Sequence, residues 1–246
     1  MATCKILNYN LGYGLGLKGS VQEYIFNFHR YVRRPPDVRL RALTGLRDVL
    51  RREQPDLCCL SEVDDDLVTS LKDMVDAEYP HTDVENKYGI ESVLRKLPVF
   101  SDSGNAFLSR QPLPFSKHYL KTGTKRLVYE MQPRANVHVF AGHFSLTKHT
   151  RRQQFRELKE LTERHSNVVV CGDFNIFHGF DELKELIQQT GLRLLNSERE
   201  YTYPTHRPNR TLDLFLCSPH LKVKRFDILK DVHSSDHLPV LLELDL

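Results

Sequence analysis

One stretch of the chain, residues 168–175 (VVVCGDFN), joins an apolar run to a glycine and two polar side chains. Four consecutive apolar residues are typical of a strand buried on both faces. Strand side chains alternate with period two, so Asp173 and Asn175 point the same way if extended geometry persists past Gly172. Glycine permits a close backbone approach or a turn at that point. The pattern fits a turn that ends the strand as well as a site for a metal or phosphate.

Length and composition indicate one globular domain over residues 1–246, with 40% hydrophobic and 27% charged residues. No apolar run approaches the roughly 20 residues that span a bilayer, so we expect no transmembrane segment. The first residues lack the features of a signal peptide. Three of the five cysteines lie in apolar, strand-like surroundings and none forms a Cys-x-x-Cys pair, which predicts reduced, buried thiols. We therefore expect a cytoplasmic protein, and a monomer.

Positive charge is concentrated near the N-terminal third of the chain, although the net charge is only +3. Eight arginines lie between residues 30 and 52, and Asp37 is the one acid there before Asp48. Clustered arginine fits an anionic partner such as a phosphate, a nucleic acid or a lipid headgroup. The alternative interpretation is a solvated helix face.

Short apolar runs alternate with segments of helical periodicity. Strands are predicted over 5–10, 56–61, 104–108, 126–131, 136–142, 167–171, 211–217 and 238–244. Helices are predicted over 38–54, 149–165 and 180–190. Two of the strands, 126–131 and 136–142, follow each other like a hairpin. This combination of helices and strands favours an α/β or α+β layered sandwich over strict βαβ winding. The segment 12–37 is long and irregular, and we expect it to be functional or mobile.

Several predicted strands carry polar side chains at or near their ends that suit a metal–phosphate site. They are Asn10, Glu62, His143, Asp173, Asn175, Asp213, Asp236 and His237. Asn10 could instead open a turn, Glu62 could cap the next helix, and a single histidine is often an ordinary surface or core residue. Asp213 lies within an apolar strand, where an acid is costly to bury without a partner. An imidazole is a suitable partner, because an Asp–His pair fixes the tautomer and basicity of the ring.

Seven short segments resemble the endonuclease/exonuclease/phosphatase superfamily, which includes deoxyribonuclease I, abasic-site endonucleases, neutral sphingomyelinases and inositol-polyphosphate 5-phosphatases. They are residues 6–10 (ILNYN), 55–62 (PDLCCLSE), 104–110 (GNAFLSR), 142–146 (GHFSL), 172–175 (GDFN), 212–215 (LDLF) and 235–237 (SDH), in the order found in the family. The resemblance covers nearly the whole chain. It implies a deoxyribonuclease I-like fold, in which a two-sheet β-sandwich is flanked by helices and the site lies at one end of the strands.

The resemblance also implies a mechanism for hydrolysis of a phosphate ester by in-line attack of water. Asn10, Glu62 and Asp236 would bind one hard cation, Mg²⁺ or Mn²⁺. Asp173 would orient or deprotonate the water, and Asn175 would hold the water or a phosphate oxygen. Two histidines, His237 held by Asp213 and His143, would contact the non-bridging oxygens. By analogy, His143 is favoured near the leaving group.

The substrate is less constrained than the chemistry. A phospholipid headgroup, a sugar phosphate and a nucleic acid all remain open, and an endonuclease or exonuclease is the main alternative to a phosphodiesterase or phosphatase acting on small molecules or lipids. The candidate substrate-binding residues are Asn105, Arg110, Arg151, Arg152 and Arg207.

Two other functional classes are alternatives to an enzyme. Residues 14–19 (GLGLKG) satisfy the G-x-G-x-x-G pattern of dinucleotide-binding folds, but the residues that follow are aromatic and basic instead of forming an amphipathic helix. A catalytically silent binding module would be indicated by loss of Asp173 or His237, and both residues are present.

Overall fold

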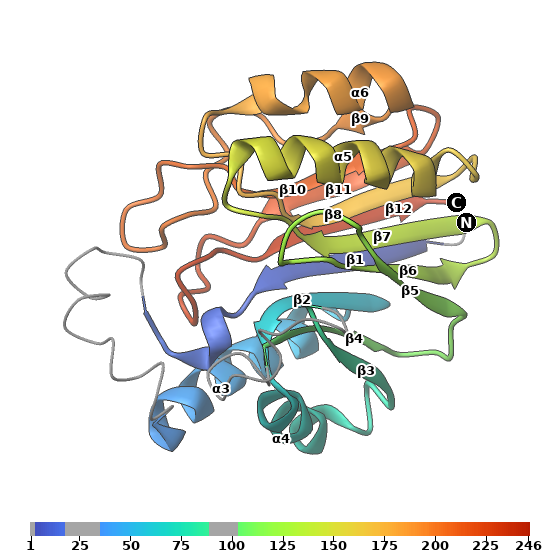
Figure 1. The fold of residues 1–246 in the computed structure, drawn as a ribbon. Coiled ribbons are helices and arrows are strands. Elements are labelled where there is room, and N and C mark those ends of the chain that lie inside the picture. The colour runs from blue at the N-terminus through green and yellow to red at the C-terminus, as the bar shows by residue number, and fades with distance from the viewer. Residues whose placement is uncertain (1–2, 18–34, 89–102) are drawn as a thin grey trace.

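The computed structural model describes residues 3–17, 35–88 and 103–246. Two six-stranded sheets face each other, and helices lie against the outer face of each (Figure 1). This is the helix-flanked β-sandwich expected from the sequence. The predicted long irregular segment falls largely outside the described residues.

The first sheet contains both ends of the described chain. Its strands are, in spatial order, β11 (Lys222–Ile228), β12 (Val240–Asp245), β1 (Thr3–Asn10), β2 (Leu57–Val63), β4 (Gly104–Ser109) and β3 (His81–Asn86). β1 runs parallel to β2 and antiparallel to β12, with Thr3 opposite Asp245. The two ends of the described chain therefore lie side by side (Figure 1).

The second sheet is built mostly from neighbours in the chain. Its strands are, in spatial order, β5 (Phe115–Tyr119), β6 (Leu127–Arg134), β7 (Val137–His143), β8 (Val168–Asp173), β10 (Asp213–Cys217) and β9 (Arg193–Leu194). β6 and β7 form the predicted hairpin, whereas β7 and β8 are parallel and connected through a helix.

Four α-helices of the described chain cover the sheets: α3 (Pro36–Glu53) and α4 (Asp65–Val75) pack on the first sheet, and α5 (Lys148–Thr162) and α6 (Lys184–Thr190) on the second. Short 3₁₀ turns follow β1 (Gly12–Gly14) and precede α6 (Phe180–Leu183). The side chain of Asp64 accepts a hydrogen bond from the Leu67 amide, 2.8 Å away, at the start of α4. Asp64 is therefore the N-cap, and the interpretation of Glu62 as a helix cap is wrong.

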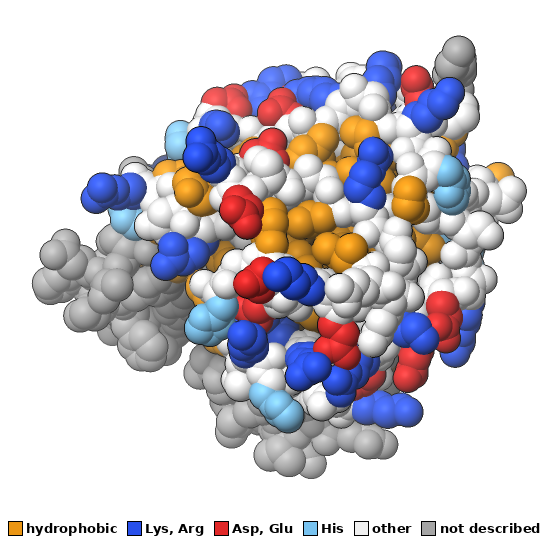
Figure 2. Space-filling model, turned by 90° about the horizontal axis from the view of Figure 1, so that it is seen from above, with side chains coloured by type: hydrophobic (Ala, Val, Ile, Leu, Met, Phe, Trp, Pro, Cys, Tyr) orange, Lys and Arg blue, Asp and Glu red, His pale blue; other side chains and the backbone are white. Residues whose placement is uncertain are grey.

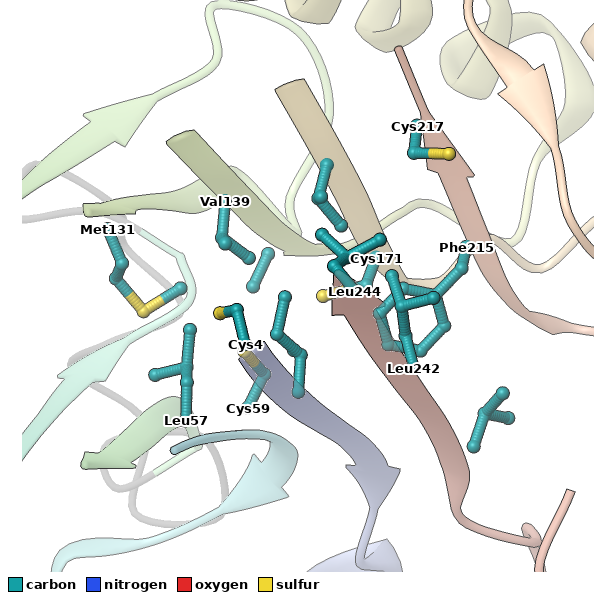
Figure 3. Close-up of a cluster of buried hydrophobic side chains, with 14 of the residues drawn as sticks. Cys4, Leu57, Cys59, Met131, Val139, Cys171, Phe215, Cys217, Leu242 and Leu244 are labelled. Carbon is teal, nitrogen blue, oxygen red and sulfur yellow. The ribbon is translucent and has the colours of Figure 1, made fainter. Parts of the chain in front are cut away.

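The main hydrophobic core lies between the two sheets. Figure 3 shows Cys4, Cys59 and Cys171, from three different strands, meeting there among Leu, Val and Phe side chains. All five cysteines are buried and free, as the sequence predicted. Two further clusters fill the spaces between each sheet and its helices.

Each predicted strand corresponds to a central strand of a sheet, and each predicted helix is present. The strands that the sequence pattern missed are β3, β5, β9 and β11, which are the four edge strands. Their residues are mostly half-buried or exposed, so they lack the apolar runs on which the prediction depended. Helix α4, which contains three acidic residues and contacts β3, was also missed.

Candidate functional site

The alternation of side chains along β1 explains how a polar residue comes to lie between the sheets. Cys4 and Ile6 point into the inter-sheet core, whereas Leu7 and Tyr9 pack against the helices on the outer face. Asn10 has the same parity as Cys4 and Ile6, so it also faces the other sheet. It ends the strand, and thus places an amide at the edge of the core instead of within it.

Three adjacent strands of the second sheet supply matching polar residues by the same rule. His143 ends β7, Asp173 ends β8, and Asp213 begins the antiparallel strand β10. The pairing register places Asp173 opposite both His143 and Asp213. All three share the parity of residues in the inter-sheet core, so they point toward the first sheet and meet Asn10 at one end of the sandwich.

Glu62 reaches this site through an irregularity in its strand. Simple alternation after Cys59 would turn Glu62 away from the second sheet. Instead, the register of β2 against β4 shifts between Ser61 and Val63, and Glu62 has a φ of +53°, as in a β-bulge. Its Oε1 lies 3.8 Å from Nε2 of His143. The bulge therefore redirects the carboxylate into the site.

Gly172 has the role that the sequence suggested, but Asn175 does not continue the strand. A Cβ at Gly172 would lie 1.8 Å from the Gly142 carbonyl oxygen, so the close approach of β7 and β8 requires glycine. The strand ends at Asp173, and Asn175 has a φ of +52°. The condition of persistent extended geometry is thus not met. The Asn175 side-chain amide instead donates to the Phe144 carbonyl over 2.9 Å.

Asp173 is the hub of the site. Its Oδ2 accepts a hydrogen bond from Asn10 Nδ2 at 3.0 Å, and its Oδ1 accepts from the Asn175 backbone amide at 3.0 Å. His143 Nε2 lies 3.3 Å and His237 Nε2 4.0 Å from Oδ2. Burial raises the pKa of Asp173 to about 6, although the positive charge of His237 opposes the shift. Asp173 therefore stabilises the turn that ends β8 through the Asn175 amide and also faces Asn10 and the two histidines, so the turn is part of the site.

His237 and Asp213 form the pair that the buried acid required. Nδ1 of His237 lies 2.7 Å from Oδ2 of Asp213, and both side chains are buried. Burial alone would lower the pKa of His237, but the charge and hydrogen bond of Asp213 outweigh it and raise the pKa to about 10. His237 is thus held as an imidazolium at neutral pH.

Two lysines that the sequence analysis missed also enter the site. Lys125 Nζ contacts His143 Nε2 and lies 3.9 Å from Glu62 Oε1, and buried Lys87 follows β3. Burial and then the Lys125 and Lys87 charges lower the pKa of His143 well below its ordinary value. The predicted hairpin already placed the start of strand 126–131 beside His143, so Lys125 could have been found. Lys87 follows an edge strand that gave no signal.

Lysine charges also act on the carboxylates and on each other. Burial alone would raise the pKa of Glu62, but Lys87, Lys125 and His237 outweigh it and lower that pKa. Burial and the Lys87 charge lower the pKa of Lys125 to about 8, against the opposing pull of Glu62. The site thus combines an ionised glutamate with a lysine that titrates just above neutral pH.

Asp236 lies beside Asn10 across the 3₁₀ turn that follows β1. The Gly12 amide donates to Asn10 Oδ1 over 3.0 Å, and a Cβ on Gly12 would lie 2.9 Å from Asp236 Oδ1. Asn10 therefore opens a turn, as the alternative interpretation expected, and still faces the site. Ser235 Oγ donates to Asp236 Oδ1 over 3.0 Å and positions the carboxylate.

The structure brings only part of the candidate substrate-binding set to the site. Asn105 is buried near the site end of β4, opposite Ser61, and its Oδ1 has no hydrogen-bond partner among the described residues. Arg110 follows the other end of β4, where Ser109 pairs with Leu57 at the start of β2. Arg110 therefore lies at the far end of the sheet, and its expected contact with substrate is not supported.

Two of the remaining arginines are committed to structural contacts. Arg151 is buried, donates over 2.8 Å to the carbonyl oxygens of Ser145 and Leu146, and pairs with Glu182. Arg152 is exposed and lies 2.6 Å from Glu185 on α6. Figure 2 shows the corresponding face, where basic and acidic side chains alternate around an apolar centre. Arg151 and Arg152 thus join α5 to the α6 region instead of reaching the site, which corrects the expectation from sequence.

Arg207 lies in a loop that reaches the site through another residue. The loop begins at Tyr203, whose ring centroid is 4.8 Å from that of His237, and Tyr203 pairs with Arg210. Arg207 itself is exposed. The loop is therefore positioned beside the site, and Arg207 stays a candidate substrate contact.

The described arginines of segment 30–52 all lie on α3 and are paired with acids. Arg39 lies 2.5 Å from Asp64, and four others also have acidic partners: Arg41 with Asp37, Arg47 with Asp48, Arg51 with Glu78, and Arg52 with Glu53 and Asp231. Arg30, Arg33 and Arg34 lie outside the described residues. The described part of the cluster is thus an ion-paired helix surface, as the solvated-face interpretation expected.

The glycine pattern at residues 14–19 is not followed by the structure of a dinucleotide site. Within residues 3–17, β1 leads into a single 3₁₀ turn at Gly12–Gly14 and not into an α-helix. Gly19 lies outside the described residues. In the described part of the chain, no helix has both the length and the apolar character needed to cross a membrane.

A family model described as the Endonuclease/Exonuclease/phosphatase family matches residues 7–237. The chain belongs to this family. Its members include phosphodiesterases, nucleases and phosphatases, and they hydrolyse phosphate esters. No curated protein matches the chain by sequence.

Solved structures with the same fold cover essentially the whole chain. The endonuclease/exonuclease/phosphatase of Bacteroides vulgatus is 18% identical, with a TM-score of 0.68 and 100% of each chain covered. The human Nocturnin catalytic domain is 18% identical, with a TM-score of 0.70, and the match covers 99% of this chain and 94% of that one. D. rerio TDP2, solved with a single-strand DNA product, is 14% identical, with a TM-score of 0.68 and 100% of each chain covered.

Proposed function

We propose that this protein is a Mg²⁺- or Mn²⁺-dependent hydrolase that cleaves a phosphate ester by in-line attack of water. The observation that carries the proposal is Asp173, a buried carboxylate with a pKa near 6, set between two histidines and an asparagine at the end of the sandwich. A general base works best when its pKa lies close to the working pH. Family membership supports the same class of reaction.

Asn10, Glu62 and Asp236 would hold the cation. All three offer oxygen donors, which Mg²⁺ and Mn²⁺ prefer, and the lowered pKa of Glu62 keeps that carboxylate ionised. Asn10 Oδ1 and Asp236 Oδ1 both adjoin Gly12, where the absence of a side chain leaves space. The residues therefore fit such an ion. When bound, it would neutralise charge on the phosphate and on the leaving oxygen.

The second-sheet residues would act on the water and the phosphate. Asp173 would orient the water and accept its proton, and Asn175, whose amide is fixed by Phe144, would help to hold it. His237, kept cationic by Asp213, would stabilise the negative charge that develops on the non-bridging oxygens.

The leaving oxygen needs a proton, and His143 alone is poorly suited to supply it. Its lowered pKa keeps the ring neutral, but the Lys125 ammonium contacts its Nε2. With a pKa near 8, Lys125 is largely protonated at neutral pH. We assign proton delivery to the Lys125–His143 pair, which extends the role expected for His143.

A nuclease acting on DNA or RNA is the second candidate function. The observation that favours it is an aromatic pair beside His237: Phe177, 38% exposed, has its ring centroid 6.5 Å from that of Tyr203. Such rings can stack on a nucleobase, but also on other planar groups. TDP2, which shares the fold, was solved with a single-strand DNA product. The ion-paired arginines of α3 do not add support for a nucleic-acid backbone.

Hydrolysis of bis(p-nitrophenyl) phosphate by metal-loaded protein tests the proposal. Turnover should require Mg²⁺ or Mn²⁺ and should fall by about 10³-fold in Asp173→Asn, because the base is lost. Asp181→Asn, at an exposed residue paired with Lys184, is the matched control and should keep wild-type turnover. The hydrolase assignment is overturned if metal-loaded protein hydrolyses neither monoesters nor diesters. Plasmid DNA, RNA, sphingomyelin and inositol phosphates then separate the substrate classes.

A further inference from the structure

A second group of metal-ligating side chains lies well away from the candidate site. Glu130 of β6, His138 of β7 and His165, which follows α5, each place one donor atom within 4.8 Å of the other two. His138 pairs with Val168 at the start of β8, five residues before His143 on the same strand. Five strand residues span about 16 Å, so the two groups are separate. The proposed hydrolysis uses none of these three side chains.

The spacing of the donor atoms suits a small tetrahedral ion. Glu130 Oε1 lies 3.0 Å from His138 Nδ1 and 3.1 Å from His165 Nε2. Nitrogen and oxygen ligands lie about 2.1 Å from Zn²⁺, so two of them in a tetrahedral shell stand about 3.4 Å apart. Glu130 Oε1 thus lies within about 0.4 Å of this separation from each ring nitrogen, and the two nitrogens lie within 4.8 Å of each other.

Neighbouring contacts hold the group together. The rings of His138 and His165 are stacked, with centroids 3.6 Å apart and an interplanar angle of 22°. An imidazole binds a metal in its neutral form through the in-plane lone pair of one nitrogen, so the two rings would turn toward the ion when it binds. His118 Nε2 lies 2.8 Å from Glu130 Oε2 and holds the other oxygen of the same carboxylate. An outer partner of this kind orients a ligand.

We propose that Glu130, His138 and His165 form a Zn²⁺ site, with His118 as the positioning residue for Glu130. Two imidazoles and one carboxylate suit Zn²⁺ better than Mg²⁺, which prefers an all-oxygen shell. The ligands come from two strands of the second sheet and from the segment after α5. A bound ion would thus cross-link the sheet to that segment, at a distance from the phosphate-ester chemistry.

Zn²⁺ titration of the full chain against a chromophoric chelator, with Mg²⁺ in excess to occupy the oxygen site, tests this proposal. Wild type and His149→Gln, an exposed histidine of α5, should each bind one equivalent. The double variant His138→Gln/His165→Gln should bind at least about 100-fold more weakly, and His118→Gln about 10-fold more weakly. Equal affinity in wild type and the double variant would overturn the site, as would failure of wild type to bind Zn²⁺.

A measurement on the unmodified protein covers the case in which the double variant does not fold. Zn²⁺ should shift the side-chain ¹⁵N resonances of His138 and His165 in NMR spectra, in proportion to the ion added up to one equivalent. Shifts confined to other histidines would show that these two rings form a hydrogen-bonded network with Glu130 and no metal site.

Discussion

Asp173 lies between two histidines that differ in charge: one is cationic and the other is neutral. On one side, His237 Nε2 lies 4.0 Å from Asp173 Oδ2, and on the other His143 Nε2 lies 3.3 Å from the same oxygen. Both rings are buried. His237 faces Asp213, whereas His143 faces Lys125. The pKa of His237 is accordingly raised to about 10, and that of His143 is lowered well below its ordinary value.

The comparison shows that neighbouring charges, and not burial, distinguish the two histidines. Burial lowers the pKa of both rings, so burial alone would leave both neutral. The carboxylate of Asp213 reverses the shift on its side, and the ammonium of Lys125 deepens it on the other. One fold therefore provides a fixed cation and a neutral ring within reach of the same carboxylate, which suits the charge-stabilising and proton-delivery roles proposed for them.

Asp213→Asn should have the largest effect on the difference between the two histidines, because it removes the charge that makes His237 cationic. The pKa of His237 should fall below 10, and kcat for bis(p-nitrophenyl) phosphate should fall by about 10³-fold. Steady-state kinetics at saturating metal, with an NMR titration of His237, measure both. Asp227→Asn, at a residue of the edge strand β11, is the matched control. A kcat close to the wild-type value in Asp213→Asn would contradict the role assigned to His237.

His143→Gln should have the next largest effect, and it should impair proton delivery without changing the charge of His237. We expect kcat to fall by about 10²-fold, since the partner of Lys125 in proton delivery is lost. The pKa of His237 should stay near 10, because a neutral ring exerts no charge on it. Kinetics and the same NMR titration distinguish the outcomes. A large drop in the pKa of His237 would show that the charge states of His143 and His237 are not independent.

Lys125→Gln should make the two histidines more alike. The pKa of His143 should rise toward its ordinary value, and kcat should fall by about 10-fold. Wild-type activity should decline as the pH rises through about 8, where Lys125 loses its proton, and this alkaline limb should be missing in the variant. Rate profiles against pH for both proteins provide the test. An unchanged alkaline limb in Lys125→Gln would exclude Lys125 as its source.

Asp173→Asn should stabilise the metal-free protein slightly although it lowers turnover. The pKa of Asp173 is raised to about 6 in the fold, so the folded state resists ionisation and is penalised at neutral pH. We expect the free energy of unfolding to rise by about 1 kcal/mol at pH 7, because hydrogen bonds from Asn10 and Asn175 offset part of the penalty. The gain should shrink as the pH falls through about 6 and vanish below about 4. Urea unfolding at pH 7 and pH 4 measures it, and a loss of stability at pH 7 would contradict the assignment.

The sequence predicted the centre of the fold well and its edges poorly, for a physical reason. Central strands such as β8 are apolar on both faces and produce continuous runs, whereas the four edge strands have one open side and carry charged residues. The missed residue Lys87 follows one of those edge strands, β3. An edge strand without an apolar run is not predicted from the sequence, and the residues that follow it are therefore not placed either.

Residues at the ends of central strands were predictable because alternation fixes the face on which they lie. Asn10, Asp173 and Asp213 follow that rule. Glu62 reaches the site only through a bulge, whose position depends on the pairing of β2 with β4 and not on local sequence. The structure places Arg151 away from the site because charge alone does not reveal a partner: Arg151 is paired with Glu182, 31 positions along the chain.

The proposed mechanism depends most on the different charge states of the two histidines that flank Asp173. Side-chain ¹H–¹⁵N NMR of the metal-free protein, recorded from about pH 5 to about pH 9, reads the protonation of each ring nitrogen directly. We expect His237 to carry protons on both nitrogens throughout most of this range, while His143 carries only one. The proposed roles of the two rings are contradicted if both titrate together near the ordinary histidine pKa of about 6.5, or if His143 is the cation and His237 the neutral ring.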